Sequence, residues 1–427
     1  MNKRNSIALL VVNACQLVAV MFVHKFLVAH VFMFSDYDIA AVGWFLLLMF
    51  PPLFVAQALS AVISRRFGAV HTKRLSSILF AAFIVCVIIF QDRLHEWYMW
   101  FGMFFGVAQG FFWGANNVLK TRVNDKSRLM GFVAAYFVIV TSAKLLFPVT
   151  FGLVIDNTAL WVASAVVLVV CLFKFVATFA IKLPRDENCD RRLRVAKFLG
   201  RVREQKLTGV FAWFWVIQLV RKIGVTLGFW VTILIALEYG TQTWVGIFWS
   251  GFALVWMFVI TFYKKAKSKI KNRLYWAVTG VILVVPAVIF FDVGFWGIMA
   301  LQLAIIVQYV ISLEEKTARL NLPKYLSCEE YVEECHLVGE VGKTIGRLTS
   351  AGLLVVVGLF GGNMLLFAIM VYVMIAALAV EAVILFFWNK RFIWNKKYKE
   401  YMCPDLVEIS DEEDEVAMDC VCVKDIR

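Results

Sequence analysis

Two nearly identical stretches, "VTSAKLL" at 140–146 and "LTSAGLL" at 348–354, decide the predicted fold. The first lies inside the long apolar segment 131–155, "GFVAAYFVIVTSAKLLFPVTFGLVI". It carries a lysine, Lys144, where the second copy has Gly352. A repeated stretch inside an apolar segment predicts the same local packing in two halves of the chain. The lysine in only one copy indicates that this copy also contacts something charged.

The composition predicts a membrane protein. The chain has 427 residues, of which 62% are hydrophobic and 17% charged, whereas a soluble domain is near half apolar and a quarter charged. The apolar residues form runs of about twenty, the length that crosses a bilayer core of roughly 30 Å. The net charge of +13 is spread over short loops between these runs. That placement excludes a basic nucleic-acid-binding domain.

Twelve apolar segments divide the chain into two sets of six. A first bundle is expected within 1–182 and a second within 208–393, joined by a charged linker at 183–207. The remainder, 394–427, is an acidic tail with too little apolar content to fold alone. The expected spans are about 6–32, 38–62, 76–91, 96–119, 131–154, 158–181, 208–237, 242–263, 274–291, 293–314, 337–360 and 363–389.

Basic residues orient these spans. One set of loops includes "SRRFGAVHTKR" at 64–74 and "KKAKSKIKNR" at 264–273. The opposite set, such as "FSDYD" at 34–38 and "EYGTQT" at 238–243, contains Arg93 as its only basic residue. Because cytoplasmic loops carry the excess of lysine and arginine, both termini and the linker are expected in the cytoplasm. The expected location is a bacterial cytoplasmic (plasma) membrane, crossed many times.

Further matches follow the order of the spans. "CQLV" at 15–18 matches "IQLV" at 217–220, and "KTRVND" at 120–125 matches "KTARLN" at 316–321. Both sets of six start on the cytoplasmic side, so the repeat is parallel, about an axis along the membrane normal. Secondary transporters use such repeats and bind substrate at their interface near the bilayer midplane.

This organisation resembles the major facilitator superfamily. The family's loop motif between spans two and three reads roughly G-x-x-x-D-R-x-G-R-R, and this chain has "AVISRRFGAV" at 61–70. Arg66 and Gly68 match, whereas Ala61 and Arg65 replace the glycine and the acidic residue. The resemblance implies a latch on the cytoplasmic gate. Glu340, at the start of the eleventh span, is expected to supply its negative charge to Arg65 or Arg66.

The resemblance also places a substrate cavity among spans one, four, seven and ten. A charged side chain at mid-membrane costs about 2.5–3.5 kcal/mol on insertion scales, so it usually faces a cavity or a partner. Lys144 and the Arg221/Lys222 pair are therefore candidate substrate contacts, although pairing with a buried acid or snorkelling remains open. The candidate substrate-binding residues are Gln16, Gln109, Asn116, Asn117, Lys144, Gln218, Arg221, Lys222 and Gln302.

The other charged residues inside the predicted spans are not assigned to the substrate cavity. Lys174 is interpreted as snorkelling toward the cytoplasm. Lys343 and Arg347 are the expected partners of Glu381, the main acid inside a span.

Four glycines recur every four residues along the fourth span and predict close approach of another helix. They are Gly102, Gly106, Gly110 and Gly114.

Cations and amides in a cavity favour an anionic substrate, such as a carboxylate, a phosphate or a lipid headgroup. The predicted function is secondary active transport of a small anionic solute by alternating access, by a monomer. The alternatives are a lipid or glycolipid translocase and a transport-inactive membrane receptor or assembly protein. Coupling to protons would use His24 or Glu381, whereas exchange of anions would need neither.

The sequence contains no motif that indicates an enzyme. "VGEVGKTIG" at 338–346 resembles a phosphate-binding loop, but Leu337 stands where the motif requires glycine. The nine cysteines match no standard zinc spacing. We therefore expect no cofactor, no metal and no enzymatic activity.

Overall fold

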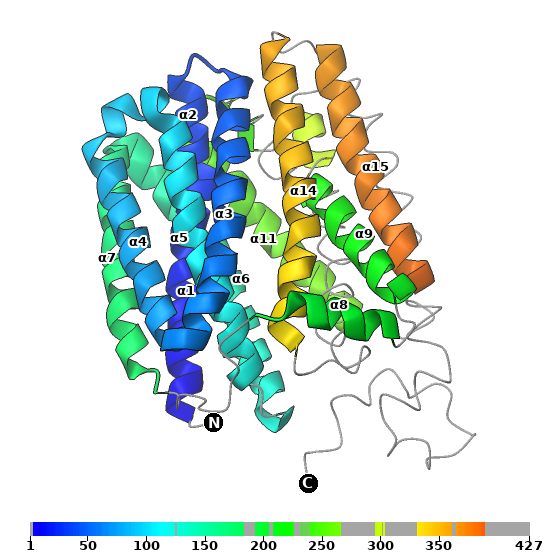
Figure 1. The fold of residues 1–427 in the computed structure, drawn as a ribbon. Coiled ribbons are helices and arrows are strands. Elements are labelled where there is room, and N and C mark those ends of the chain that lie inside the picture. Colours follow the sequence, from blue (N-terminus) through cyan, green and yellow to red (C-terminus); the bar gives the residue numbers. More distant parts are fainter. Residues whose placement is uncertain are drawn as a thin grey trace.

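The computed structural model is built from helices throughout the part that it describes (Figure 1). The description covers residues 3–123, 126–182, 193–204, 208–225, 239–265, 331–360 and 364–388, with short pieces at 232–233, 235–236, 295–300 and 302–303; the side chains of Asn117, Val118 and residues 120–137 are left out. The predicted acidic tail lies outside these residues.

The first half contains seven α-helices. The first two are separated by a π-helical turn, Val23–Leu27. The helices are α1 (Lys3–Phe22), α2 (Val28–Phe34), α3 (Ile39–Phe67), α4 (Ala69–Ile89), α5 (Leu94–Val123), α6 (Lys126–Asn157) and α7 (Leu160–Ala177).

In the second half, a short helix of the linker comes first, at the end of the molecule where α1 begins (Figure 1). The helices described in this half are α8 (Val195–Glu204), α9 (Thr208–Val225), α11 (Gln242–Lys265), α14 (Val332–Leu359) and α15 (Met364–Trp388).

Seven helices of the described residues are long and apolar enough to cross a membrane, and Ile369–Ile384 is a shorter apolar helix. Helices occupy the predicted spans one to eight, eleven and twelve. The ninth predicted span lies outside the described residues, and the tenth is described only at 295–300 and 302–303. The chain is thus an all-helical multi-pass membrane protein, and the full set of twelve spans stays a prediction.

One residue at each end of α3 fixes where this helix begins and ends. Asp38 caps the start of α3, because its Oδ1 accepts a hydrogen bond from the backbone nitrogen of Ala40 at 2.7 Å. At the other end, Gly68 has φ +98° and separates α3 from α4. Glycine adopts this conformation without steric strain, so the matched motif glycine makes the tight turn between spans two and three.

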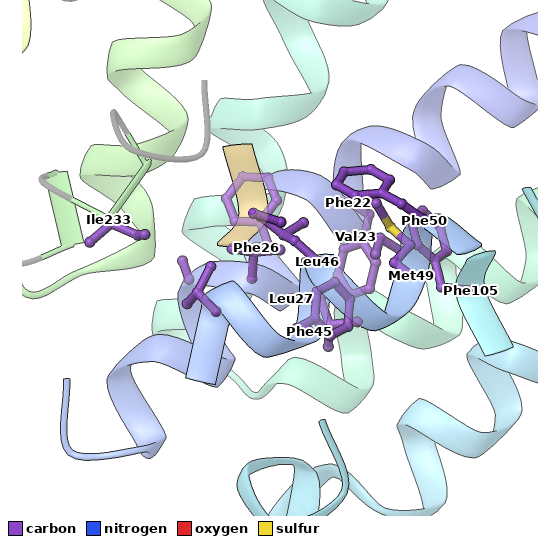
Figure 2. Packing of buried hydrophobic residues seen from close by; sticks show 14 of the residues in the cluster. Phe22, Val23, Phe26, Leu27, Phe45, Leu46, Met49, Phe50, Phe105 and Ile233 are labelled. Atoms are coloured by element: carbon purple, nitrogen blue, oxygen red, sulfur yellow. The ribbon is translucent and has the colours of Figure 1, made fainter. Parts of the chain in front are cut away.

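The glycine ridge of α5 packs against α3, as predicted. A Cβ atom at Gly102, Gly106 or Gly110 would collide with backbone oxygens of α3, and one at Gly114 would meet the Ser60 side chain. Figure 2 shows the aromatic core beside this contact. It joins Phe22 and Phe26 to Phe45, Phe50 and Phe105, and Ile233 adds a side chain from the second half.

The two halves touch mainly along two pairs of helices, α3 with α14 and α6 with α11. Glycines again permit the contact. A Cβ atom at Gly43 would lie 2.8 Å from Cγ2 of Val355, and one at Gly246 would lie 2.8 Å from the carbonyl carbon of Pro148. Both glycines lie in the parts of α3 and α11 nearest the predicted outer side, so the halves are packed backbone to backbone there.

Replacing Gly106 by valine tests the ridge. The added side chain has no room between α5 and the Met49–Leu53 backbone, and overpacking costs about 1–3 kcal/mol. We expect Gly106→Val to lower the thermal midpoint of the purified protein by several degrees. Gly251→Val is the matched control, since Gly251 is also helical and has no atom within 4 Å of an added Cβ. Equal losses in both variants would contradict the packing role.

Candidate functional site

A group of charged side chains lies between α9 and α14. Glu340 Oε1 is 2.5 Å from Lys343 Nζ, and its Oε2 is 3.6 Å from Arg347 Nη1. Lys222 of α9 interacts electrostatically with both cations and with Glu340. The two helices meet closely because Gly346 lies against the backbone oxygen of Leu219. One carboxylate therefore faces three cations.

The neighbouring acid, Glu381 of α15, is fully buried and has a different partner from the expected one. Arg221 Nε lies 3.9 Å from its Oε1. The expectation that Lys343 or Arg347 pairs with Glu381 is wrong. Those two residues follow Glu340 by three and seven positions, so they share its face of α14 and interact with Glu340 instead.

Two lysines of the first half lie on tryptophan rings of the second half. Lys25 Nζ is 3.0 Å from the ring centroid of Trp249, and Lys144 Nζ is 4.3 Å from that of Trp256. Both tryptophans belong to α11, seven residues apart and thus on one face. Cation–π attraction favours such contacts. The structure therefore places Lys144 at the boundary between the halves, and its predicted contact with substrate stays a prediction.

Contacts across the boundary join these lysines to the charged group of α14. The Arg347 guanidinium lies 5.7 Å from the ring centroid of Phe50 on α3. His24 interacts electrostatically with Lys25 and Arg347, and its ring meets Phe105 edge-on at 5.4 Å. His24 and Lys25 both lie in the π-helical turn, a feature that is frequent at functional sites. We call Lys25, Lys144, Lys222, Lys343 and Arg347 the boundary cations.

Two predicted cavity amides are bound inside the first half instead. Gln16 Oε1 accepts a hydrogen bond from Lys174 Nζ at 2.5 Å, and Asn116 Oδ1 accepts one from Lys73 Nζ at 2.9 Å. Lys174 has no exposed surface, so its interpretation as a snorkelling residue is wrong.

The remaining predicted amides are placed as follows. Gln109 is buried on α5 and Gln218 is buried on α9. Gln302 Nε2 donates to the backbone oxygen of Phe248 at 3.5 Å, which holds it against α11. The side chain of Asn117 lies outside the described residues.

The predicted cytoplasmic end carries an ionic contact between the halves, which we call the cytoplasmic latch. Arg65 at the end of α3 is hydrogen-bonded to Glu333, and its Nη2 lies 3.0 Å from both carboxylate oxygens of Glu334. The backbone nitrogen of Arg194 in the linker also donates to Glu334, at 3.0 Å. The expected partner, Glu340, is wrong: it lies almost two turns further along α14 and faces Lys343 and Arg347.

Arg66, the neighbour of Arg65, has an exposed side chain. Its guanidinium lies 5.4 Å from the ring centroid of Phe67. The sequence analysis did not identify Glu333 and Glu334. They come directly before the eleventh predicted span, and their position next to the span is the signal that could have found them.

The predicted outer end has a second latch, which the sequence did not indicate. Asp156 at the end of α6 accepts hydrogen bonds from the backbone nitrogens of Gln242 at 3.0 Å and Thr243 at 2.6 Å. A carboxylate at this position is favoured because a helix N-terminus carries partial positive charge. Gln242 Nε2 also lies 3.5 Å from Sδ of Met33. One acid of the first half therefore caps α11 of the second.

Solved structures with the same arrangement are transporters. A POT family transporter, PepTSo, aligns with a TM-score of 0.69 and 10% identity, over 93% of this chain and 99% of that one. An auto-inhibited POT family peptide transporter gives a TM-score of 0.68 at 12% identity, over 91% and 97%. The nucleoside transporter NupG gives 0.60 at 12% identity, over 91% and 100%. The chain shares the fold of these solved structures.

This confirms at the level of fold the resemblance drawn from the sequence. No protein-family model matches the chain. An uncharacterized protein in the sodM 3′ region of Geobacillus stearothermophilus is 26% identical over 95 residues. That match covers 22% of this chain and 44% of the relative, so it spans less than half of the relative's length.

Neutralising Arg65 tests the cytoplasmic latch. Cys335, next to Glu334, has a buried side chain and reports opening when all other cysteines are replaced. Hydrogen bonds to charged groups contribute about 1.5–3 kcal/mol, so we expect Arg65→Gln to speed labelling of Cys335 by a soluble maleimide about tenfold. Arg66→Gln, a change of the same type at an exposed neighbour, should leave the rate near that of the parent. Equal rates in the two variants would contradict the latch.

Truncating Asp156 tests the outer latch. Loss of an N-cap costs about 1 kcal/mol, so Asp156→Ala should raise the accessibility of the outer end about fivefold. Labelling of a cysteine introduced at Met33 by an impermeant maleimide, added to the outside of cells, measures it. Asn157→Ala is the control, because Asn157 hydrogen-bonds only to Leu153 of its own helix among the described contacts. Labelling of Asp156→Ala no faster than that of this control would contradict the role of Asp156 as a latch.

Proposed function

We propose that this chain is a secondary active transporter that moves a small anionic solute by alternating access of its two halves. The MFS-like fold supports transport as the class of function. The observation that carries the choice of an anion is the group of five boundary cations, which come from both halves. Among the described interactions, the carboxylates that act on them are Glu340 and Glu381.

The charge imbalance argues for an anion from outside the chain. Among the described residues, Glu340 and Glu381 bring two negative charges to four cations, Arg221, Lys222, Lys343 and Arg347. Lys25 rests on an indole ring, a contact that attracts a cation without cancelling its charge. A buried charge without an opposite charge is expensive in a low-dielectric site. An entering carboxylate or phosphate would supply the missing charge.

Each boundary cation has a role in this proposal. Arg347 offers a planar guanidinium suited to two parallel hydrogen bonds with a carboxylate or phosphate. Lys222, Lys25 and Lys144 add positive charge from the two sides of the boundary, and Lys25 would leave the Trp249 ring to reach the solute. Gln16 and Asn116 are left out of the site, because their oxygens accept from Lys174 and Lys73.

Alternating access would use the two latches. The Arg65 latch joins α3 to α14 at one end, and the Asp156 latch joins α6 to α11 at the other. Both are closed in this structure, and transport would open them in turn. His24 and Glu381 remain candidates for coupling to protons, while exchange of one anion for another would need neither. The proposal places a monomer in the cytoplasmic membrane with both termini inside.

Binding of anions to the purified protein tests the proposal. A panel of carboxylates and phosphates, each paired with its uncharged ester or amide, is screened for a rise in the thermal midpoint. We expect at least one anion to stabilise the protein while its uncharged analogue does not. In the double variant Lys222→Met/Arg347→Gln the half-maximal concentration should rise at least tenfold, a loss of about 1.4 kcal/mol.

Lys197→Met is the control for net charge, because Lys197 is exposed on α8. It should respond to the anion like the parent. The proposal is contradicted if the double variant keeps the parent's response, or if uncharged analogues stabilise as well as the anions do.

A further inference from the structure

The linker helix α8 lies across the ends of α9 and α14 (Figure 1). Phe198 and Val202, four residues apart and so on one side of the helix, are buried. The Phe198 ring centroid lies 5.4 Å from that of Phe211 in the first turn of α9, and 6.3 Å from that of Tyr331, directly before α14. Apolar contacts on one side therefore hold α8 against the ends of two membrane helices.

This position sets α8 at the edge of the bilayer. Only residues 205–207 separate Glu204, the last residue of α8, from Thr208, the first of α9. Such a connection reaches at most about 14 Å when fully extended. Trp213, in the second turn of α9, has 47% of its surface exposed, and tryptophan is enriched at the membrane–water interface. The helix therefore lies at the depth of the lipid headgroups.

The surface of α8 that the protein leaves open is basic and partly apolar. Lys197, Arg201 and Arg203 are exposed, and no hydrogen bond or ion pair with the described part of the chain involves their side chains. Glu204 is the only acidic residue of the helix. Leu199, which is 43% exposed, precedes Arg203 by four positions and so shares its side of the helix.

Helix stability explains part of this pattern. Cations in the last turn are favoured by the partial negative charge of a helix C-terminus, which accounts for Arg201 and Arg203. It does not account for Lys197, which lies in the first turn, where a cation is unfavourable. The whole linker segment 182–206 has nine lysines and arginines against four aspartates and glutamates. A basic, partly apolar helix at headgroup depth is complementary to anionic lipid.

We propose that α8 binds the anionic headgroups of the lipid leaflet beside it. Lys197, Arg201 and Arg203 supply the positive charge, and Leu199 inserts at the boundary between headgroups and acyl chains. The long arginine side chains reach the phosphates while their methylene groups stay on apolar surface. This interaction needs neither a transported solute nor the boundary cations, so it is independent of the proposed transport.

Phosphatidylglycerol is the probe. Leu199→Cys, made in the full-length protein with the other cysteines replaced, is labelled with bimane, whose emission shifts to the blue in apolar surroundings. The protein is placed in nanodiscs of phosphatidylcholine that contain increasing fractions of phosphatidylglycerol. We expect a saturable blue shift with phosphatidylglycerol that high salt reverses, because salt screens charges at an aqueous surface.

Arg201→Gln/Arg203→Gln tests the role of the charges. Each cation near an anionic surface strengthens binding about fivefold, so the double variant should need at least ten times more phosphatidylglycerol for the same shift. Glu204→Gln is the matched control, because it removes an exposed charge of opposite sign from the same helix. It should respond at least as strongly as the parent.

Three results would overturn the proposal. The first is no shift with phosphatidylglycerol in the parent, and the second is an unchanged shift in Arg201→Gln/Arg203→Gln. The third concerns the acidic tail, whose segment 405–419 is another anionic partner that the sequence offers. If the tail covers α8 in place of lipid, the double variant changes the emission equally in nanodiscs with and without phosphatidylglycerol.

Discussion

A cation buried in a membrane-embedded bundle needs a partner, and this requirement organises the interior of the protein. The structure meets it in three ways. Arg65, Arg221 and Lys343 face carboxylates, Lys174 is bound to an amide oxygen, and Lys25 lies on an indole ring. The three kinds of partner differ in how much charge they cancel. Carboxylates hold Arg65 at the predicted cytoplasmic end, whereas a ring and an amide oxygen are the described contacts of Lys25 and Lys174.

Close helix packing brings these charges together. Glycines let α5 lie against α3, α14 against α9, and each half against the other with backbones in contact. The boundary between the halves is therefore narrow, so lysines of one half reach tryptophans of the other. The same boundary ends in ionic contacts, Arg65 with Glu334 on one side and Asp156 with the start of α11 on the other. In the alternating access that we propose, the contacts at the two ends would break in turn. Their modest strength would allow each of them to open.

The sequence predicted the helices well because length and apolar content are local properties. It also predicted the glycine ridge, since that depends on spacing within one span. It did not predict the partners of individual charged side chains, because helix rotation and tertiary packing decide those partners. Lys174 points inward instead of toward the surface, and Glu333 and Glu334, not Glu340, hold Arg65. Trp249 is uncharged, so nothing in the sequence marks it as the partner of Lys25. No residue spacing predicts the π-helical turn at Val23–Leu27.

The central claim is that the boundary cations recognise the solute by its negative charge. Counterflow in proteoliposomes tests it most directly, because it detects exchange of a labelled solute whatever the coupling ion. Each candidate anion is compared with its uncharged ester or amide. The account predicts that an anion is accumulated and its uncharged analogue is not, and that neutralising Lys222 and Arg347 together removes the difference. Equal accumulation of both forms by the unmodified protein would contradict it.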